Sequence, residues 1–62
     1  MTFVTFSRRD WLGRKRFYFR LVAENHEPVA YGEGYANRVD RDETINLIRA
    51  RAGGARIKEL DE

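Results

Sequence analysis

Basic side chains dominate the residues of this chain that could do chemistry. The first 20 residues hold six bases and one acid, a local charge of +5, whereas residues 21–62 hold six bases and nine acids, a charge of −3. A patch of this kind attracts phosphates or an acidic partner, and the alternative is that solvent-facing arginines keep a small protein soluble. The candidate contacts for nucleic acid or another anion are Arg8, Arg9, Trp11, Arg14, Lys15, Arg16 and Arg20.

Aromatic residues among these bases add a second possibility. Trp11 and Tyr18 offer faces on which bases could stack, as in proteins that bind nucleic acid. The alternative is structural, with Trp11 stapling its loop and Tyr18 belonging to the core.

Catalytic and metal-binding groups are scarce. Ser7 is the only serine and His26 the only histidine, and no arrangement of nucleophile, base and orienting acid is visible. Glu24, Glu27 and Glu33 could gather at one strand end and bind a cation, although a solvated pair or a surface ion pair is the ordinary outcome. We therefore expect no catalytic residues, no cofactor, no metal and no enzymatic activity.

Gly32-Glu33-Gly34, just ahead of a predicted helix, is similar to a phosphate-binding turn. The segment lacks the third glycine and the parallel βαβ setting of G-x-G-x-x-G. Close packing or a β-bulge is the better interpretation of these glycines.

The elements that must position these groups centre on residues 17–35, where apolar residues alternate as in a half-buried strand. We expect strands over about 2–8, 14–24 and 28–33. Gly13 takes a positive φ in the first loop, and Asn25-His26 forms a two-residue type I′ turn between the second and third strands. Phe3 is then expected opposite Phe19.

A helix is predicted over about 38–52, capped by Asn37 and ended by Gly53-Gly54. Its apolar stripe contains Ile45 and Ile48, and Leu47 lies outside it. A short fourth strand is predicted over about 55–60. Residues 1–62 thus form one α+β domain, a β-β-β-α-β unit with an antiparallel sheet and one helix on one face.

Size and composition predict an oligomer. A domain of 62 residues buries too little surface to be more than marginally stable alone, and without cysteine or a metal site it needs a partner subunit. We expect a homodimer. The lack of cysteine fits the cytoplasm, and the short apolar runs and the N-terminal sequence argue against a membrane span or signal peptide.

The stretch FYFRLVAENHEPVAYGEGYANRVDRDETINLIRARA resembles the repeat unit of the YegP-like family, small proteins of unknown function. The matching positions include Phe17, Phe19, Leu21, Ala23, Asn25, Glu27, Glu33, Tyr35, Ile45 and Ile48. His26 stands where the family usually has Gly, and Gly32 where a small hydroxyl residue is usual.

The resemblance implies that two β-β-β-α-β units build one continuous sheet and exchange their C-terminal strands. In a single-repeat chain this means a homodimer in which residues 55–60 of each copy join the other's sheet. The family carries no established catalytic residues to transfer. We expect a non-enzymatic protein-interaction or structural module with an unknown protein partner, and nucleic-acid binding through the basic first hairpin is the alternative.

Overall fold

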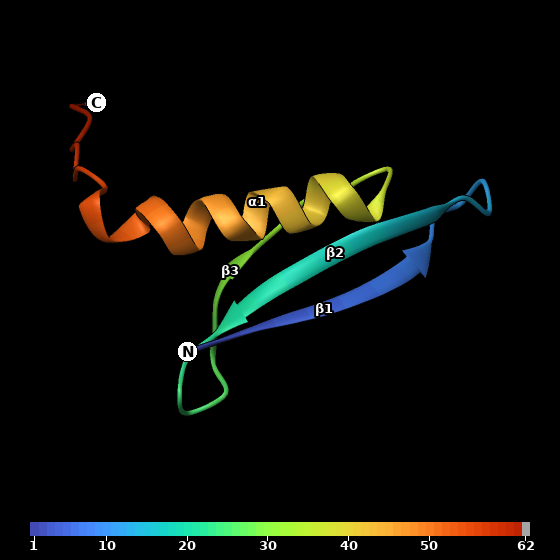
Figure 1. The fold of residues 1–62 in the computed structure, drawn as a ribbon, viewed down its shortest axis with the longest axis horizontal. Coiled ribbons are helices and arrows are strands. Elements are labelled where there is room, and N and C mark those ends of the chain that lie inside the picture. Colours follow the sequence, from blue (N-terminus) through green and yellow to red (C-terminus); the bar gives the residue numbers. More distant parts are fainter. Residues whose placement is uncertain (62) are drawn as a thin grey trace.

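The computed structural model describes residues 1–61 as a three-stranded antiparallel sheet followed by one helix. The strands are β1 (Thr2–Arg9), β2 (Lys15–Val22) and β3 (Pro28–Tyr31), in the order β1-β2-β3. The helix α1 (Arg38–Arg51) crosses one face of the sheet (Figure 1). The predicted α+β class with its single helix is confirmed. Within residues 1–61, no helix is long and apolar enough to cross a bilayer.

The pairing of β1 with β2 preserves the predicted faces but not the predicted partners. Phe3 lies opposite Leu21, and Thr5 lies opposite Phe19. The register therefore differs by two residues from the predicted pairing of Phe3 with Phe19. Because side chains alternate with a period of two, a shift of two leaves every residue on its expected face.

The turn between β2 and β3 corrects the sequence prediction. His26 alone takes a positive φ, 66°, whereas a type I′ turn needs two such residues. Backbone hydrogen bonds from the His26 N–H to Ala23 O and from the Ala23 N–H to Glu27 O, both 2.9 Å, close a three-residue loop instead. A positive φ at His26 alone is less costly than a positive φ at both Asn25 and His26, because neither residue is glycine.

This longer loop changes how the start of β3 pairs with β2. Leu21 pairs with Ala30 as predicted, but Val22 pairs with Pro28, and the register shifts between them. Val29 is the extra residue of the resulting bulge and is exposed.

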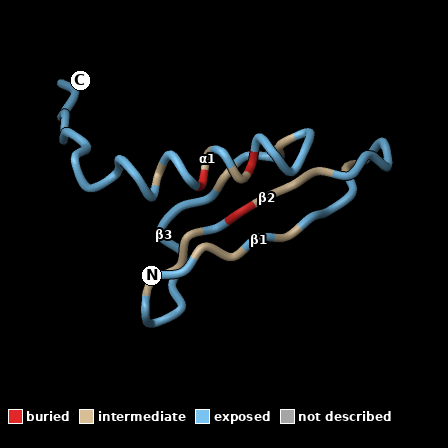
Figure 2. Tube along the Cα trace, viewed as in Figure 1, coloured by how far each residue is buried: buried red, intermediate tan, exposed pale blue. Residues whose placement is uncertain are grey.

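The core is small and centres on β2. Phe19 (3% exposed) and Ile45 of α1 (9%) are its buried apolar residues (Figure 2). The Phe19 ring lies 5.7 Å from the Phe3 ring and 6.3 Å from the Tyr35 ring, measured between centroids. It also covers Gly32, where a β-carbon would come within 2.1 Å of its Cε2 atom. Gly32 therefore serves close packing, as predicted.

The helix begins as its sequence predicts. The Asn37 side chain accepts a hydrogen bond from the Asp40 N–H at 2.8 Å and donates one to the Asp40 carboxylate at 3.1 Å. The helix ends at Arg51, and a 3₁₀ turn over Ala52–Gly54 follows it. Leu47 is 58% exposed, as its place outside the stripe predicts.

Residues 55–61 form neither helix nor strand in the single chain, so the predicted strand over 55–60 is not formed there. The segment leaves the end of α1 away from the sheet (Figure 1), and no sheet edge of its own chain lies beside it. Ile57 and Leu60 are 101% and 73% exposed. Exchange of this segment with a second copy stays a prediction.

Candidate nucleic-acid interface on the first hairpin

The loop between β1 and β2 is organised by the Asp10 carboxylate. Its Oδ1 accepts hydrogen bonds from the backbone N–H groups of Leu12 and Arg14, each at 2.9 Å. Its Oδ2 accepts from the Nε atoms of Arg14 at 3.1 Å and Arg16 at 3.3 Å. The Arg14 N–H first, and then the Leu12 N–H and the two guanidinium groups, hold the pKa of Asp10 below its usual range. The candidate residues Arg14 and Arg16 are therefore both bound to the Asp10 carboxylate.

Gly13 completes this loop with the predicted positive φ, 78°. Its N–H donates to Asp10 O at 2.9 Å, and the Asp10 N–H donates to Arg14 O at 2.8 Å. Arg9 adds a hydrogen bond from Nη1 to Gly13 O at 2.9 Å. The chain thus turns in a three-residue loop of the same pattern as the turn at His26.

Trp11 lies at the tip of this loop with 89% of its surface exposed. A side chain with so little contact cannot staple the loop, so the structural alternative for Trp11 is wrong. Leu12 beside it is 53% exposed. The Trp11 indole is therefore exposed to solvent, at the tip of a loop that lies at one end of the sheet (Figure 1).

The strand register divides the remaining candidate bases between two faces. Arg8 pairs with Arg16 on the face that carries no helix, and Arg20 lies on that face too, because it is four residues from Arg16. Arg9 and Lys15 pair on the opposite face. We define the helix-free face by Val4, Phe6, Arg8, Arg16, Tyr18, Arg20 and Tyr31.

An aromatic pair occupies the centre of the helix-free face. The rings of Phe6 and Tyr18 stack with a centroid distance of 5.3 Å and an interplanar angle of 9°. The guanidinium carbons of Arg8 and Arg20 lie 5.3 and 5.4 Å from the Phe6 centroid, in cation–π range. Both rings are half-buried and remain uncovered by the helix.

Two further groups were missed by sequence reasoning. Tyr31 pairs with Arg20 and is 69% exposed on the helix-free face. On the helix side, Arg38 and Arg41 place their guanidinium carbons 5.5 and 5.8 Å from the Phe17 centroid, and Lys15 Nζ lies 5.6 Å from it. The spacing of Arg38 and Arg41 by three residues, which puts them on one helix face, was the available signal.

The sheet is uniformly positive. The strands β1, β2 and β3 contain five bases and no acid. Arg14 and Arg16 pair with Asp10, and Arg41 pairs with Asp42. Within residues 1–61, no carboxylate forms an ion pair with Arg8 or Arg20.

The remaining candidate groups do not come together. Ser7 pairs with Phe17 on the helix side, whereas His26 lies in the turn after β2. In the part of the chain that the structure describes, no three His, Asp or Glu side chains are placed to hold a metal ion, so Glu24, Glu27 and Glu33 form no such cluster.

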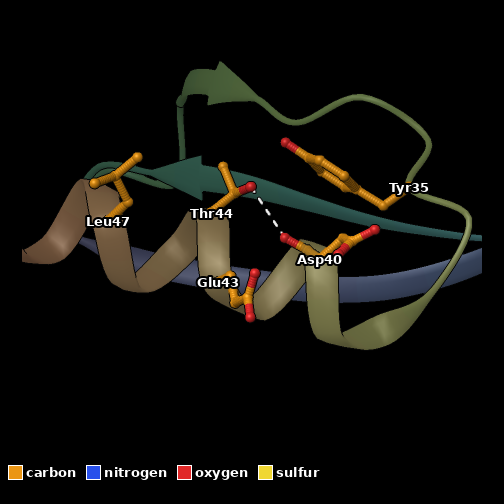
Figure 3. Close-up of a pocket in the computed structure, with 5 residues that line it drawn as sticks. All are labelled: Tyr35, Asp40, Glu43, Thr44 and Leu47. Atoms are coloured by element: carbon orange, nitrogen blue, oxygen red, sulfur yellow. Dashed lines mark hydrogen bonds between the residues drawn. The ribbon is translucent and has the colours of Figure 1, made fainter.

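Hollows on the surface of residues 1–61 include the following pair. One of about 420 Å³ lies between the helix and Tyr35 and is lined by Asp40, Glu43, Thr44 and Leu47 (Figure 3). The other, of about 290 Å³, lies on the helix-free face between Val4, Arg20, Val22, His26 and Pro28.

Fold and surface together define a small α+β unit with a basic, aromatic sheet face. The family described as Domain of unknown function (DUF1508) matches residues 14–59. A UPF0339 protein of Neisseria meningitidis serogroup B is 32% identical over 44 residues, which cover 71% of this chain and 79% of that protein. The UPF0339 protein in the ptx operon 5′ region of Stutzerimonas stutzeri is 33% identical over 48 residues, 77% of this chain and 43% of that protein. The chain belongs to the DUF1508 family of unknown function, which confirms the resemblance to YegP-like proteins.

Proposed function

We propose that this protein is a non-enzymatic homodimeric module that serves a structural role or binds another protein. Its exposed surface carries the proposal. A compact monomer of 7.3 kDa is expected to expose about 4,200 Å², whereas this chain exposes 5584 Å². The excess of about 1,400 Å² exceeds the roughly 800 Å² that each partner buries in a standard interface.

The shape supports the same proposal. The radius of gyration is 13.8 Å, against about 11 Å for a compact domain of this length. The exposed apolar residues Val39, Leu47, Ile57 and Leu60 lie on the helix and on the segment after it. Burial of these side chains against a second copy would enlarge the small core.

Charge supports the C-terminal segment as the part that is exchanged. The hollow beside α1 offers Asp40 and Glu43 around the apolar surface of Leu47 and Tyr35. A strand over residues 55–60 of a second copy would carry Arg56 and Lys58 on one face, which suits Asp40 and Glu43, and Ile57 on the other face. The relative from Stutzerimonas stutzeri is also long enough for two units, because more than half of its length lies outside the match.

The experiment is a deletion of residues 55–62, followed by sedimentation equilibrium. The intact chain is expected at about 15 kDa, twice the 7.3 kDa of one copy, and the truncated chain at about the mass of one copy, with a lower melting temperature. A truncated chain that remains an equally stable dimer would rule out a structural exchange.

Point variants separate exchange from a general loss of apolar surface. Ile57→Asn with Leu60→Asn is expected to weaken the dimer. The matched control is Trp11→Asn with Leu12→Asn, which removes two exposed apolar side chains from the hairpin tip and should leave the mass unchanged.

Nucleic-acid binding through the first hairpin is the second candidate function. The absence of any acid from strands that carry five bases and the 89% exposure of Trp11 favour it. We place either role in the cytoplasm, in line with the lack of cysteine.

Trp11 is the only tryptophan of the chain, so its fluorescence reports on the hairpin directly. Addition of DNA or RNA at low salt is expected to quench this fluorescence. The logarithm of the affinity should fall linearly with the logarithm of the salt concentration, because binding releases counterions. No binding of either nucleic acid at low salt would end this candidate function and leave the homodimer proposal untouched.

A further inference from the structure

The helix-free face of the sheet combines aromatic rings with the guanidinium groups of Arg8 and Arg20, which form no ion pair with a carboxylate within residues 1–61. We propose that this face binds single-stranded nucleic acid, with bases stacked on Tyr18, Phe6 and Tyr31 and with phosphates held by Arg8 and Arg20. The inference rests on the second candidate function. It names the substrate class and moves the centre of binding from the loop to the sheet.

The aromatic groups of this face lie next to one another on neighbouring strands. Phe6 and Tyr18 stack at 5.3 Å with an interplanar angle of only 9°, and Tyr31 on the next strand is 69% exposed. Gly34 leaves room for the Tyr18 ring, because a β-carbon there would lie 3.0 Å from the hydroxyl oxygen. Sheet faces with aromatic side chains bind single-stranded RNA by stacking two or three bases.

The charged groups border these rings. Arg8 and Arg20 lie within 5.4 Å of the Phe6 centroid, and Arg16 pairs with Arg8 across the strands. Arg16 is held by Asp10, whereas no acid within residues 1–61 pairs with the other two. Arg16 and Arg20 are four residues apart, about 13 Å along a strand, so cations border the rings along the length of the sheet.

The combination of aromatic rings and guanidinium groups favours one class of ligand. A duplex keeps its bases stacked inside and offers mainly phosphates to a flat protein face, so it would leave the rings unused. An acidic peptide could neutralise the arginines but would not require the stacked rings. A second copy packed face to face would bring Arg8, Arg16 and Arg20 against identical arginines, which is unfavourable. Single strands alone supply both repeated phosphates and exposed bases.

The test uses the intact chain and fluorescence anisotropy of labelled oligonucleotides of about 12 nucleotides, within the usual range of single-strand sites. Single-stranded DNA and RNA are compared with duplexes of the same sequence at low salt. The first variant is Tyr31→Leu, which removes an exposed ring. The second is Arg8→Lys with Arg20→Lys, which keeps the charge but removes the planar guanidinium groups. The control is Arg49→Lys with Arg51→Lys, on exposed residues of α1.

The intact chain is expected to bind single strands at least about tenfold more tightly than duplexes. Each variant should weaken single-strand binding by roughly fivefold or more, and the control should leave the affinity for both substrates unchanged. Melting temperatures equal to that of the unmodified chain will show that the variants are folded.

Two results would overturn the inference. If single strands and duplexes bind equally, and neither Tyr31→Leu nor Arg8→Lys with Arg20→Lys weakens single-strand binding, hairpin binding to nucleic acid stands and stacking on the helix-free face is refuted. If neither substrate binds at low salt, the second candidate function fails together with this inference.

Discussion

Replacing Gly32 with alanine directly perturbs the centre of the core. The new β-carbon would lie 2.1, 2.4 and 2.8 Å from the Cε2, Cδ2 and Cζ atoms of Phe19. All three distances are shorter than van der Waals contact allows. Phe19 is 3% exposed and has the rings of Phe3 and Tyr35 as neighbours. The Phe19 ring therefore has no open space to move into.

The expected cost follows from this geometry. Overpacking a core by one methyl group typically destabilises a protein by about 1–3 kcal/mol, and a ring trapped against backbone favours the upper half of that range. A domain of 62 residues has a total stability of about 3–9 kcal/mol. Gly32→Ala should thus remove a large share of the free energy of unfolding.

The assay is urea denaturation followed by circular dichroism at one fixed protein concentration, because dimerisation would couple stability to concentration. With a slope of about 1 kcal/mol per molar urea, the midpoint should fall by about 2 M. The control is Gly53→Ala, whose β-carbon would meet no atom within 4 Å and should change stability by less than about 0.5 kcal/mol.

A double variant tests the cause of the loss. Shortening the ring in Gly32→Ala with Phe19→Leu should show a favourable coupling energy, because the leucine leaves room for the methyl group. If Gly32→Ala unfolds at the same urea concentration as Gly53→Ala, the packing of Phe19 on Gly32 is refuted.

The remaining predictions concern the two hairpin loops. His26→Gly should stabilise the protein by about 0.5–1 kcal/mol in urea denaturation. The left-handed conformation costs an L-residue about 1–2 kcal/mol, and the greater conformational entropy that glycine loses on folding offsets only part of the gain. Asn25→Gly, at a residue without a positive φ, should bring no gain, and an equal gain would contradict the loop assignment. The lowered pKa of Asp10 means that its carboxylate adds stability at neutral pH, which is lost as the pH falls below the usual carboxyl value of about 3.9 and through the lowered value. Asp10→Asn should therefore be less stable than the unmodified chain at pH 7, and this difference should shrink in acid, whereas the control Asp61→Asn should show neither effect. A difference that does not change with pH would refute the role of the charge.

Much of the fold could be predicted from local sequence. Alternation located all three strands, and Asn37 located the helix start to the residue, because its side chain satisfies a helix N–H in the way its type predicts. The turn at His26 could not be predicted correctly. Its loop length depends on whether one or two residues take a positive φ, and Asn-His is compatible with either choice. The pairing of Phe3 likewise depended on the length of the first loop.

The residues of the candidate site could be identified from the sequence, but their arrangement in space could not. The seven residues of the basic hairpin were identifiable, yet the sequence alone did not show that Asp10 would hold Arg14 and Arg16. Tyr31 was missed because its place on the helix-free face follows from pairing with Arg20, a non-local contact. The strand over 55–60 could not be settled by local pattern, because a strand needs an edge and its own chain offers none beside it.

The mass of the intact chain in solution tests the homodimer most directly. Sedimentation equilibrium between about 1 and 100 μM should give about 15 kDa, twice the 7.3 kDa of one chain, if the surplus in the exposed 5584 Å² is covered by a second copy, as we propose. A mass of 7.3 kDa at every concentration, with a melting temperature independent of concentration, would contradict the account.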